Sequence, residues 1–429
     1  MTIGLHSVRV FSAALLMLGT AASAQPAPSP SPTRLSGETA AGARWQALVP
    51  ANWNGTLLVW SRGYSFRAGE PEPAPAEWQD ALLGQGYALA GSNYGSAGWA
   101  LAEAVPAQLA TIAAFGDRHG KPRRTIAWGA SMGGLVTTAL AEQRAPRIAG
   151  GIAFCPSISG AVGMMNMGLD GAFALKTLVP EAAGLQLHAI QDDMANGKLA
   201  ASAVAAALKT PQGRARLALA GVLGGIPGWT RRGKPQPDAA DFEAQLDEIG
   251  ASFAMGVVLP RNDQEKRAGG NFSWNTGVDY AGLLKRSGRR DFVEALYRKA
   301  GLELDTDLAR LAQAPRVAAD RGAVRYMLAN YTPTARPQVP IVSMQMVGDG
   351  LTAPALQRGY TDAAPPRMAS GLWLQEAGHC GMKVDQALIA LRHLEARLDH
   401  GRWPARPAGT VAHQPQPMLR PCFRGRTCK

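Results

Sequence analysis

Short apolar runs alternate with helical stretches through the first third of the chain, and this alternation limits the fold more than any other feature. Thr56–Trp60, Tyr87–Gly91, Thr125–Trp128 and Gly150–Phe154 are apolar runs, and segments with helical spacing separate them. Runs that are apolar throughout are typical of strands buried on both faces. The alternation therefore predicts a mostly parallel sheet flanked by helices.

A long segment without strand signals interrupts this pattern. Ala-rich and Leu-rich helical stretches fill residues 156–336, and strand-like runs return at Val339–Gly350 and Gly371–His379. An insertion of roughly 180 residues is too long for a loop and should form a folded unit. We therefore predict one α/β domain, residues 45–155 and 337–402, with a helical cap of residues 156–336. Two independent domains are less favoured, because each strand-rich end would be only part of a sheet.

The N-terminus has the features of a secretory signal peptide. Arg9 precedes an apolar stretch, and Ala22-Ser23-Ala24 supplies a small-residue cleavage site. The stretch is shorter than the about 20 apolar residues of a membrane span. We interpret residues 1–24 as a signal peptide and residues 25–44 as a Pro-rich, extended spacer. The mature protein is expected to be soluble, without a membrane span, and secreted or periplasmic.

The chain is basic, with a formal net charge of +12, and part of the excess lies in the Pro-rich C-terminal tail, residues 403–429. No acidic residue follows Asp399. A solvated basic tail is the favoured interpretation, and attraction to an anionic surface or substrate is the alternative. No nucleic-acid motif accompanies the charge, so we expect no nucleic acid as a partner. Oligomeric state is not indicated.

Residues 129–133 read Gly-Ala-Ser-Met-Gly, at the point where a predicted strand ends and a helix begins. A sharp strand-to-helix turn lifts the serine hydroxyl clear of the sheet, and small flanking residues avoid clashes there. The N–H of Met132, at the start of the helix, would point into the same space and stabilise negative charge. Ser131 is therefore a candidate nucleophile, and Met132 a candidate oxyanion donor.

A serine nucleophile needs a histidine base and a carboxylate that orients it. Asp349 follows one of the returning strands and His379 follows the next, so the chain order is Ser, Asp, His. The carboxyl ends of parallel strands meet at one edge of a sheet. His393 lies in the final helix instead, and Glu376 is too close to His379 in sequence to orient it easily.

With these residues in this order, the chain resembles the α/β-hydrolase superfamily, in particular secreted bacterial serine esterases. The resemblance covers about Trp45–Phe154 and Val339–Leu398. It implies a second oxyanion donor from the loop after the third strand, where His-Gly-x is usual. Here Arg62 stands at the histidine position, and the N–H of Tyr64 is assigned as the second donor.

Four cysteines, Cys155, Cys380, Cys422 and Cys428, allow three sets of pairs. Export makes disulfides permissible. Cys422 and Cys428 can close a small loop, which leaves Cys155 to pair with Cys380 near the predicted site. Pairing with a tail cysteine, or free thiols, are the alternatives. The spacing does not suit a metal, and no cofactor is expected.

These residues predict a secreted serine hydrolase that forms an acyl-enzyme. Small-molecule or polymeric carboxylic esters are the expected substrates, because their leaving groups are good. The alternatives are a peptidase or amidase of the same fold and a binding protein without catalysis, since a fold does not determine a function.

Overall fold

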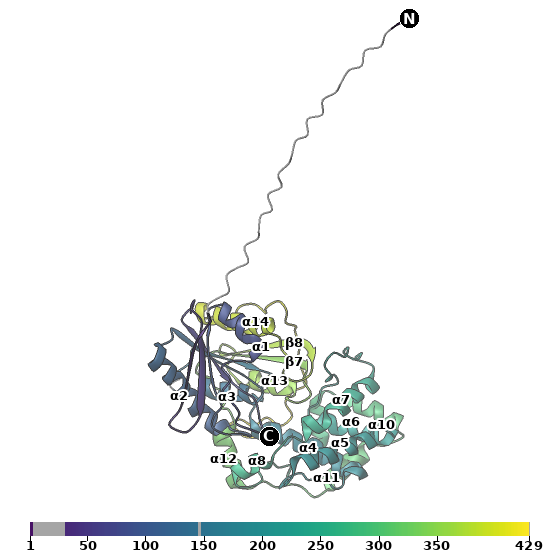
Figure 1. Ribbon diagram of the computed structural model, residues 1–429. Coiled ribbons are helices and arrows are strands. Elements are labelled where there is room, and N and C mark those ends of the chain that lie inside the picture. The colour runs from purple at the N-terminus through teal and green to yellow at the C-terminus, as the bar shows by residue number, and fades with distance from the viewer. Residues whose placement is uncertain (3–30, 145–146, 429) are drawn as a thin grey trace.

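The computed structural model describes residues 1–2, 31–144 and 147–428. The predicted signal peptide lies almost entirely outside these residues. Within them, an eight-stranded sheet has the strand order β1-β2-β4-β3-β5-β6-β7-β8. Helices cover both faces of this sheet, and a further group of helices lies beside it (Figure 1). No helix in the described part of the chain is both long and apolar enough to cross a membrane.

The sheet is antiparallel at one edge and parallel elsewhere. β1 pairs antiparallel with β2, and β2 with β4, whereas all pairs from β4 to β8 are parallel. The predicted fold class, a mostly parallel sheet flanked by helices, is confirmed. The strands are β1 (Thr33–Glu38), β2 (Arg44–Val49), β3 (Thr56–Ser61), β4 (Ala88–Ser92), β5 (Arg124–Ala130), β6 (Gly150–Phe154), β7 (Ile341–Gly348) and β8 (Ala369–Ala377).

Alternate residues of the central strands enter two separate apolar layers. In β3, Leu57 and Val59 pack with α2 and α3, whereas Leu58 and Trp60 pack with α1 and α14. This is the period of two that a pleated strand imposes. The sheet is thus buried on both faces, which explains its continuous apolar runs. The flanking helices are α1 (Ala76–Gly84), α2 (Leu101–His119), α3 (Met132–Ala141), α13 (Pro354–Ala363) and α14 (Val384–His400).

Residues 156–336, the segment that we interpret as a cap, contain helices, turns and loops and no strand. The central helix of this cap is α6, and its neighbours include α4, α7 and α10. The cap has its own apolar core, which contains Leu217, Leu219 and Phe253. The helices are α4 (Ala161–Leu178), α5 (Asp193–Ala207), α6 (Pro211–Leu223), α7 (Phe242–Val257), α8 (Asn262–Ala268), α9 (Tyr280–Ser287), α10 (Arg290–Lys299), α11 (Leu304–Gln313) and α12 (Arg321–Tyr331).

The prediction of a spacer over residues 25–44 is wrong for its second half. Thr33–Glu38 forms β1, the edge strand of the sheet, and pairs with β2. An edge strand takes its stability from backbone hydrogen bonds to a neighbour and need not bury much apolar surface. The side chains of β1 are largely exposed, so the strand has no apolar pattern that sequence inspection would detect. Residues 25–30 lie outside the described part.

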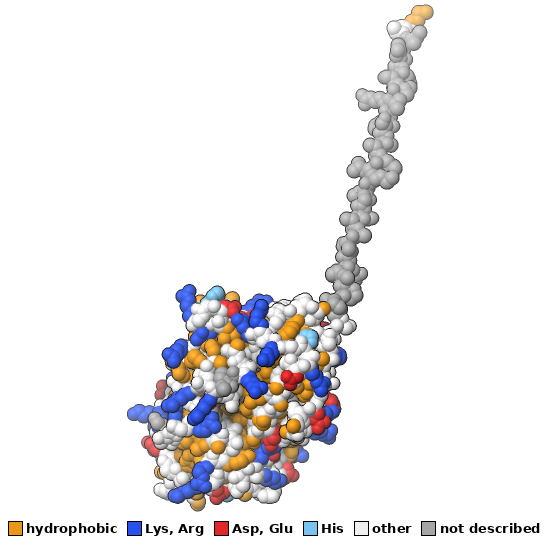
Figure 2. Space-filling model, turned by 90° about the vertical axis from the view of Figure 1, so that its left-hand side faces the viewer, with side chains coloured by type: hydrophobic (Ala, Val, Ile, Leu, Met, Phe, Trp, Pro, Cys, Tyr) orange, Lys and Arg blue, Asp and Glu red, His pale blue; other side chains and the backbone are white. Residues whose placement is uncertain are grey.

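The prediction of a solvated basic tail is also wrong in part. Arg420 is 2% exposed, and its Nη1 donates to Oδ2 of buried Asp170 on α4 at 2.8 Å. Arg426 is exposed, but its Nη2 donates to the carbonyl oxygen of Ala363 on α13 at 3.0 Å. The tail therefore packs against both cap and core. Other basic side chains are spread among apolar ones on the face drawn in Figure 2.

Candidate active site

Ser131 occupies a strained turn between β5 and α3, with a φ of 57°. Its N–H donates to the carbonyl oxygen of Phe154 at 2.9 Å, which ties the turn to β6. A Cβ on Gly133 would lie 1.9 Å from the carbonyl oxygen of Ser61, and one on Gly129 would lie 2.5 Å from that of Gly133. Both positions therefore require glycine. This steric demand explains the Gly-x-Ser-x-Gly pattern.

The structure brings the three residues selected from the sequence into one hydrogen-bonded chain. Nε2 of His379 lies 3.0 Å from Oγ of Ser131, and its Nδ1 lies 2.8 Å from Oδ2 of Asp349. The Asp349 side chain is fully buried, whereas that of His379 is 23% exposed. With the proton on Nδ1 facing the carboxylate, Nε2 is left as an acceptor for the serine hydroxyl.

Asp349 is held by its own loop. Its Oδ1 accepts from the N–H groups of Leu351 at 2.8 Å and Thr352 at 3.0 Å. The Thr352 hydroxyl lies 2.9 Å from Oδ2 of Asp349 and 2.8 Å from the carbonyl oxygen of Cys155. Sequence analysis did not assign a role to Thr352. Asp349-Gly350 is a turn signal that accounts for the bonds from these backbone N–H groups, whereas the contacts of the Thr352 hydroxyl have no such signal in the sequence.

Arg62 shapes the loop after β3. Its Nη1 donates to the carbonyl oxygen of Gly63 at 3.0 Å, and its Nη2 donates to that of Ser96 at 2.6 Å. The guanidinium also lies over the Tyr94 ring, 4.6 Å from its centroid. Burial lowers the pKa of Arg62. At the position where the related pattern has histidine, this arginine ties the loop to the segment after β4.

The two predicted oxyanion donors, Met132 and Tyr64, belong to segments next to the serine. A Cβ on Gly63 would lie 3.3 Å from Cβ of Ser131, so the backbone leading to Tyr64 passes close to Ser131. The Tyr64 ring packs against Trp99, with ring centroids 5.7 Å apart. Met132 is the first residue of α3, and the first N–H groups of a helix have no acceptor within it.

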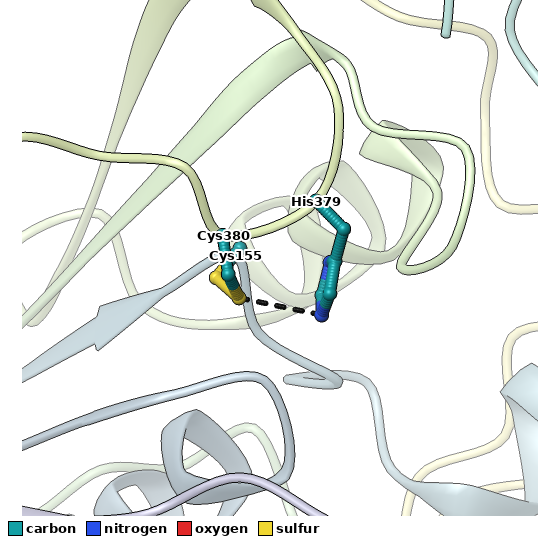
Figure 3. Close-up of side chains that lie close together, drawn as sticks. All are labelled: Cys155, His379 and Cys380. Atoms are coloured by element: carbon teal, nitrogen blue, oxygen red, sulfur yellow. Dashed lines mark hydrogen bonds between the residues drawn. A yellow bond between two sulfur atoms is a disulfide. The ribbon is translucent and has the colours of Figure 1, made fainter. Parts of the chain in front are cut away.

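Disulfides join Cys155 to Cys380 and Cys422 to Cys428. Cys155 follows β6 and Cys380 follows His379, so the first bridge links two loops of the site (Figure 3). Sγ of Cys380 lies 3.3 Å from Nε2 of His379. The sulfur atoms and this histidine are close enough to form a metal site in principle. Disulfide sulfurs are not thiolates, however, and thiolate is the form that binds metals.

We expect loss of the Cys155–Cys380 bridge to lower activity before the sheet unfolds, because the bridge positions the His379 loop and the sheet does not depend on it. The closed loop spans 225 residues, and we expect a stabilisation of about 2–4 kcal/mol. Activity and melting temperature of Cys155→Ser/Cys380→Ser check this. Cys422→Ser/Cys428→Ser is the matched control and should remain active. Full activity of the first variant would contradict this role.

A cap segment contacts the loops that carry His379 and Asp349. We call residues 225–232 the cap strap. A Cβ on Gly350, next to Asp349, would lie 3.0 Å from Cβ of Thr230. Nη2 of Arg232 donates to the carbonyl oxygen of His379 at 3.2 Å. The cap is therefore in direct contact with both of these loops.

The competing residues lie elsewhere. The His393 ring is 3.1 Å from the Ser370 hydroxyl and stacks on Trp403, between β8 and α14. Burial lowers its pKa. The Glu376 carboxylate accepts a hydrogen bond from Gln386 of α14. Neither side chain has a hydrogen bond to Ser131 or His379 among the described residues.

No family model matches this sequence. An o-phthalyl amidase from Xanthobacter agilis is 29% identical over 407 residues, covering 86% of this chain and 88% of the relative. An esterase from Aspergillus oryzae is 12% identical, with a TM-score of 0.44 over 89% of this chain and 84% of that one. A proline iminopeptidase from Mycobacterium smegmatis is 13% identical, with a TM-score of 0.42 over 86% of this chain and 100% of that one. At these scores the two solved structures carry no argument about the reaction.

Proposed function

The chain has the α/β-hydrolase fold, and from this premise we propose that it is a serine hydrolase that cleaves carboxylic esters. The observation that carries the proposal is the position of His379, whose ring nitrogens lie 3.0 Å from the Ser131 hydroxyl and 2.8 Å from the Asp349 carboxylate. A serine hydroxyl is a weak nucleophile unless a base takes its proton as it attacks. This pair of contacts supplies the base and fixes its tautomer.

The acylation half of the reaction uses each of these groups once. Nε2 of His379 takes the Ser131 proton while Oγ attacks the substrate carbonyl carbon, and the carbonyl oxygen becomes an oxyanion. The N–H groups of Met132 and Tyr64 are our choice of donors to that oxygen. The imidazolium then returns its proton to the leaving alcohol, and the acyl group stays on Ser131 as an ester.

Deacylation repeats these steps with water. His379 takes a proton from a water molecule that attacks the acyl carbon, the oxyanion forms again in the same place, and Ser131 leaves with the proton. The carboxylic acid is released. Asp349 stays ionised throughout and stabilises the imidazolium that forms twice in each cycle.

Amides are a second candidate, which the similarity to the o-phthalyl amidase favours. An amine leaves only after it has been protonated, so an amidase depends more on the delivery of a proton from the histidine than an esterase does. The same residues could perform both reactions. What differs is how the cap orients the leaving group.

Matched substrates distinguish the two reactions. Paired p-nitrophenyl esters and p-nitroanilides of acetic, butyric and benzoic acid, together with phthalic monoamides, should be compared by kcat/KM. We expect the esters to react fastest and a fluorophosphonate to label Ser131. Faster turnover of the amides would favour the second candidate. Absence of both turnover and labelling would favour the remaining alternative, a binding protein that has this fold without catalysis.

Export is part of the proposal. The N-terminal pattern that ends in Ala22-Ser23-Ala24 favours removal of a signal peptide. The two disulfides suit an oxidising compartment. We therefore propose that the enzyme acts in the periplasm or outside the cell.

A further inference from the structure

A cavity of about 450 Å³ lies between cap, core and C-terminal tail, apart from the proposed active site. Its walls come from the cap strap, from the junction of α9 and α10, from the start of α13, and from residues 413–416 of the tail. None of Ser131, Asp349 and His379 lines it. The volume falls within the range of small-molecule sites.

Arg289 contributes a cation to this cavity. Its Nη2 donates to Oε1 of Gln245 at 2.8 Å, and the guanidinium lies over the Phe292 ring at 4.3 Å. Among the described residues it has no ion pair, although Asp291 also lines the cavity and is exposed. Burial lowers the pKa of Arg289. A guanidinium has five N–H donors, so several remain for a ligand.

A second unused donor comes from the tail. Nε2 of Gln416 is buried and has no hydrogen-bond partner in the part of the chain that the structure describes. It lies beside Gly225 of the strap, where a Cβ would be 3.6 Å from this nitrogen. A buried donor without an acceptor costs free energy that a ligand oxygen would recover. The unpaired amide of Gln416 and the remaining N–H groups of Arg289 line one cavity, and together they select a ligand that is rich in acceptors.

Apart from Asp291, the remaining walls are uncharged and in part aromatic. Phe242 and Phe292 form an edge-to-face pair with ring centroids 5.5 Å apart. The indole N–H of Trp229 already donates to the carbonyl oxygen of Lys234, so Trp229 offers its ring surface. Burial lowers the pKa of His413, which therefore adds no positive charge at neutral pH. The Arg289 cation beside flat apolar walls suits one negative charge on a flat apolar body, and the Asp291 carboxylate in the same cavity disfavours a second negative charge.

We propose that this cavity binds a small aromatic monocarboxylate. The carboxylate lies against Arg289 and Nε2 of Gln416, and the ring packs against Trp229 and Phe292. The planar guanidinium matches a carboxylate in a two-bond arrangement. A single arginine is a poor match for a doubly charged phosphate. The site is separate from Ser131, so it extends the proposed function and does not depend on it.

Benzoate binding to the Ser131→Ala variant tests this site by calorimetry without any turnover. We expect saturable binding of one benzoate, and Arg289→Gln should weaken it about ten- to a hundredfold, because a charge-assisted contact is lost. Arg286→Gln is the matched control, since Arg286 is an exposed residue at the end of α9 and the charge change is the same. It should bind as tightly as the parent. Benzamide, which has the ring without the charge, should bind at least tenfold more weakly.

Further measurements keep the test decisive. If Arg289→Gln does not fold, Gln416→Leu is the second variant. It removes the other proposed donor to the carboxylate and should also weaken benzoate binding, because a hydrogen bond is lost. The anomalous signal of 4-bromobenzoate in a crystal locates the ligand. Equal affinity for the parent and for both cavity variants, a bromine beside residue 131, or no binding of benzoate would overturn the proposal. Failure of Ser131 labelling would refute the proposed function alone.

Discussion

Replacement of Ser131 by alanine should lower kcat by about 10⁶, because the base then has no nucleophile to activate. The turn should persist, since alanine keeps the Cβ and the N–H that bonds to Phe154. The measurements are kcat on the best ester of the panel, fluorophosphonate labelling and the melting temperature. Activity and labelling should disappear together while the melting temperature stays within a few degrees.

Ser157→Ala provides the matched control. This serine is 1% exposed, and its N–H donates to the carbonyl oxygen of Ser131 at 3.2 Å, so it is a buried neighbour of the same turn. In the described part of the chain the Ser157 hydroxyl has no hydrogen bond to His379, whose ring nitrogens contact Asp349 and Ser131 instead. The variant should therefore keep most of its activity. Labelling that persists in Ser131→Ala but is lost in Ser157→Ala would show that the wrong serine was chosen.

Replacement of Asp349 by asparagine should lower kcat by about 10⁴, the loss seen when a triad acid is made neutral. An amide NH₂ facing Nδ1 favours the tautomer with the proton on Nε2, and that proton faces Ser131 and blocks its activation. The Asn Oδ1 can still accept from the N–H groups of Leu351 and Thr352, so the loop should keep its shape. The kcat and the melting temperature of the variant should both be compared with those of the parent. If the melting temperatures are equal, the loss in kcat reflects the chemistry and not a change in the fold.

Glu376→Gln is the control for this prediction. It neutralises a carboxylate that lies three residues from His379 and accepts a hydrogen bond from Gln386 on α14. We expect nearly full activity. An inactive Glu376→Gln together with a fully active Asp349→Asn would assign the acid to Glu376 and contradict the role given to Asp349.

The positions of the candidate catalytic residues were predictable because each follows a strong local pattern. Apolar runs mark the buried strands, and Ser131, Asp349 and His379 each stand at the carboxyl end of one. Parallel strands bring such ends to one edge whatever the loops contain. The roles of Thr352 and Arg62 could not be predicted from such local patterns. Their roles depend on hydrogen bonds to the carbonyl oxygens of Cys155 and Ser96, and nothing in the local sequence identifies those partners.

Periodic burial is a property of short segments, so it leaves a pattern in the local sequence. From such local patterns the sequence alone predicts the parallel sheet, the helical segment 156–336 and the glycine-flanked turn at Ser131. Contacts between distant polar groups have no such period. The Arg420–Asp170 pair joins residues 250 positions apart, and β1 joins the sheet through backbone bonds that leave no apolar pattern. The cavity around Arg289 likewise exists only because cap, core and tail meet there. Folding determines these features, because each depends on which partner the packed chain brings within a few ångströms.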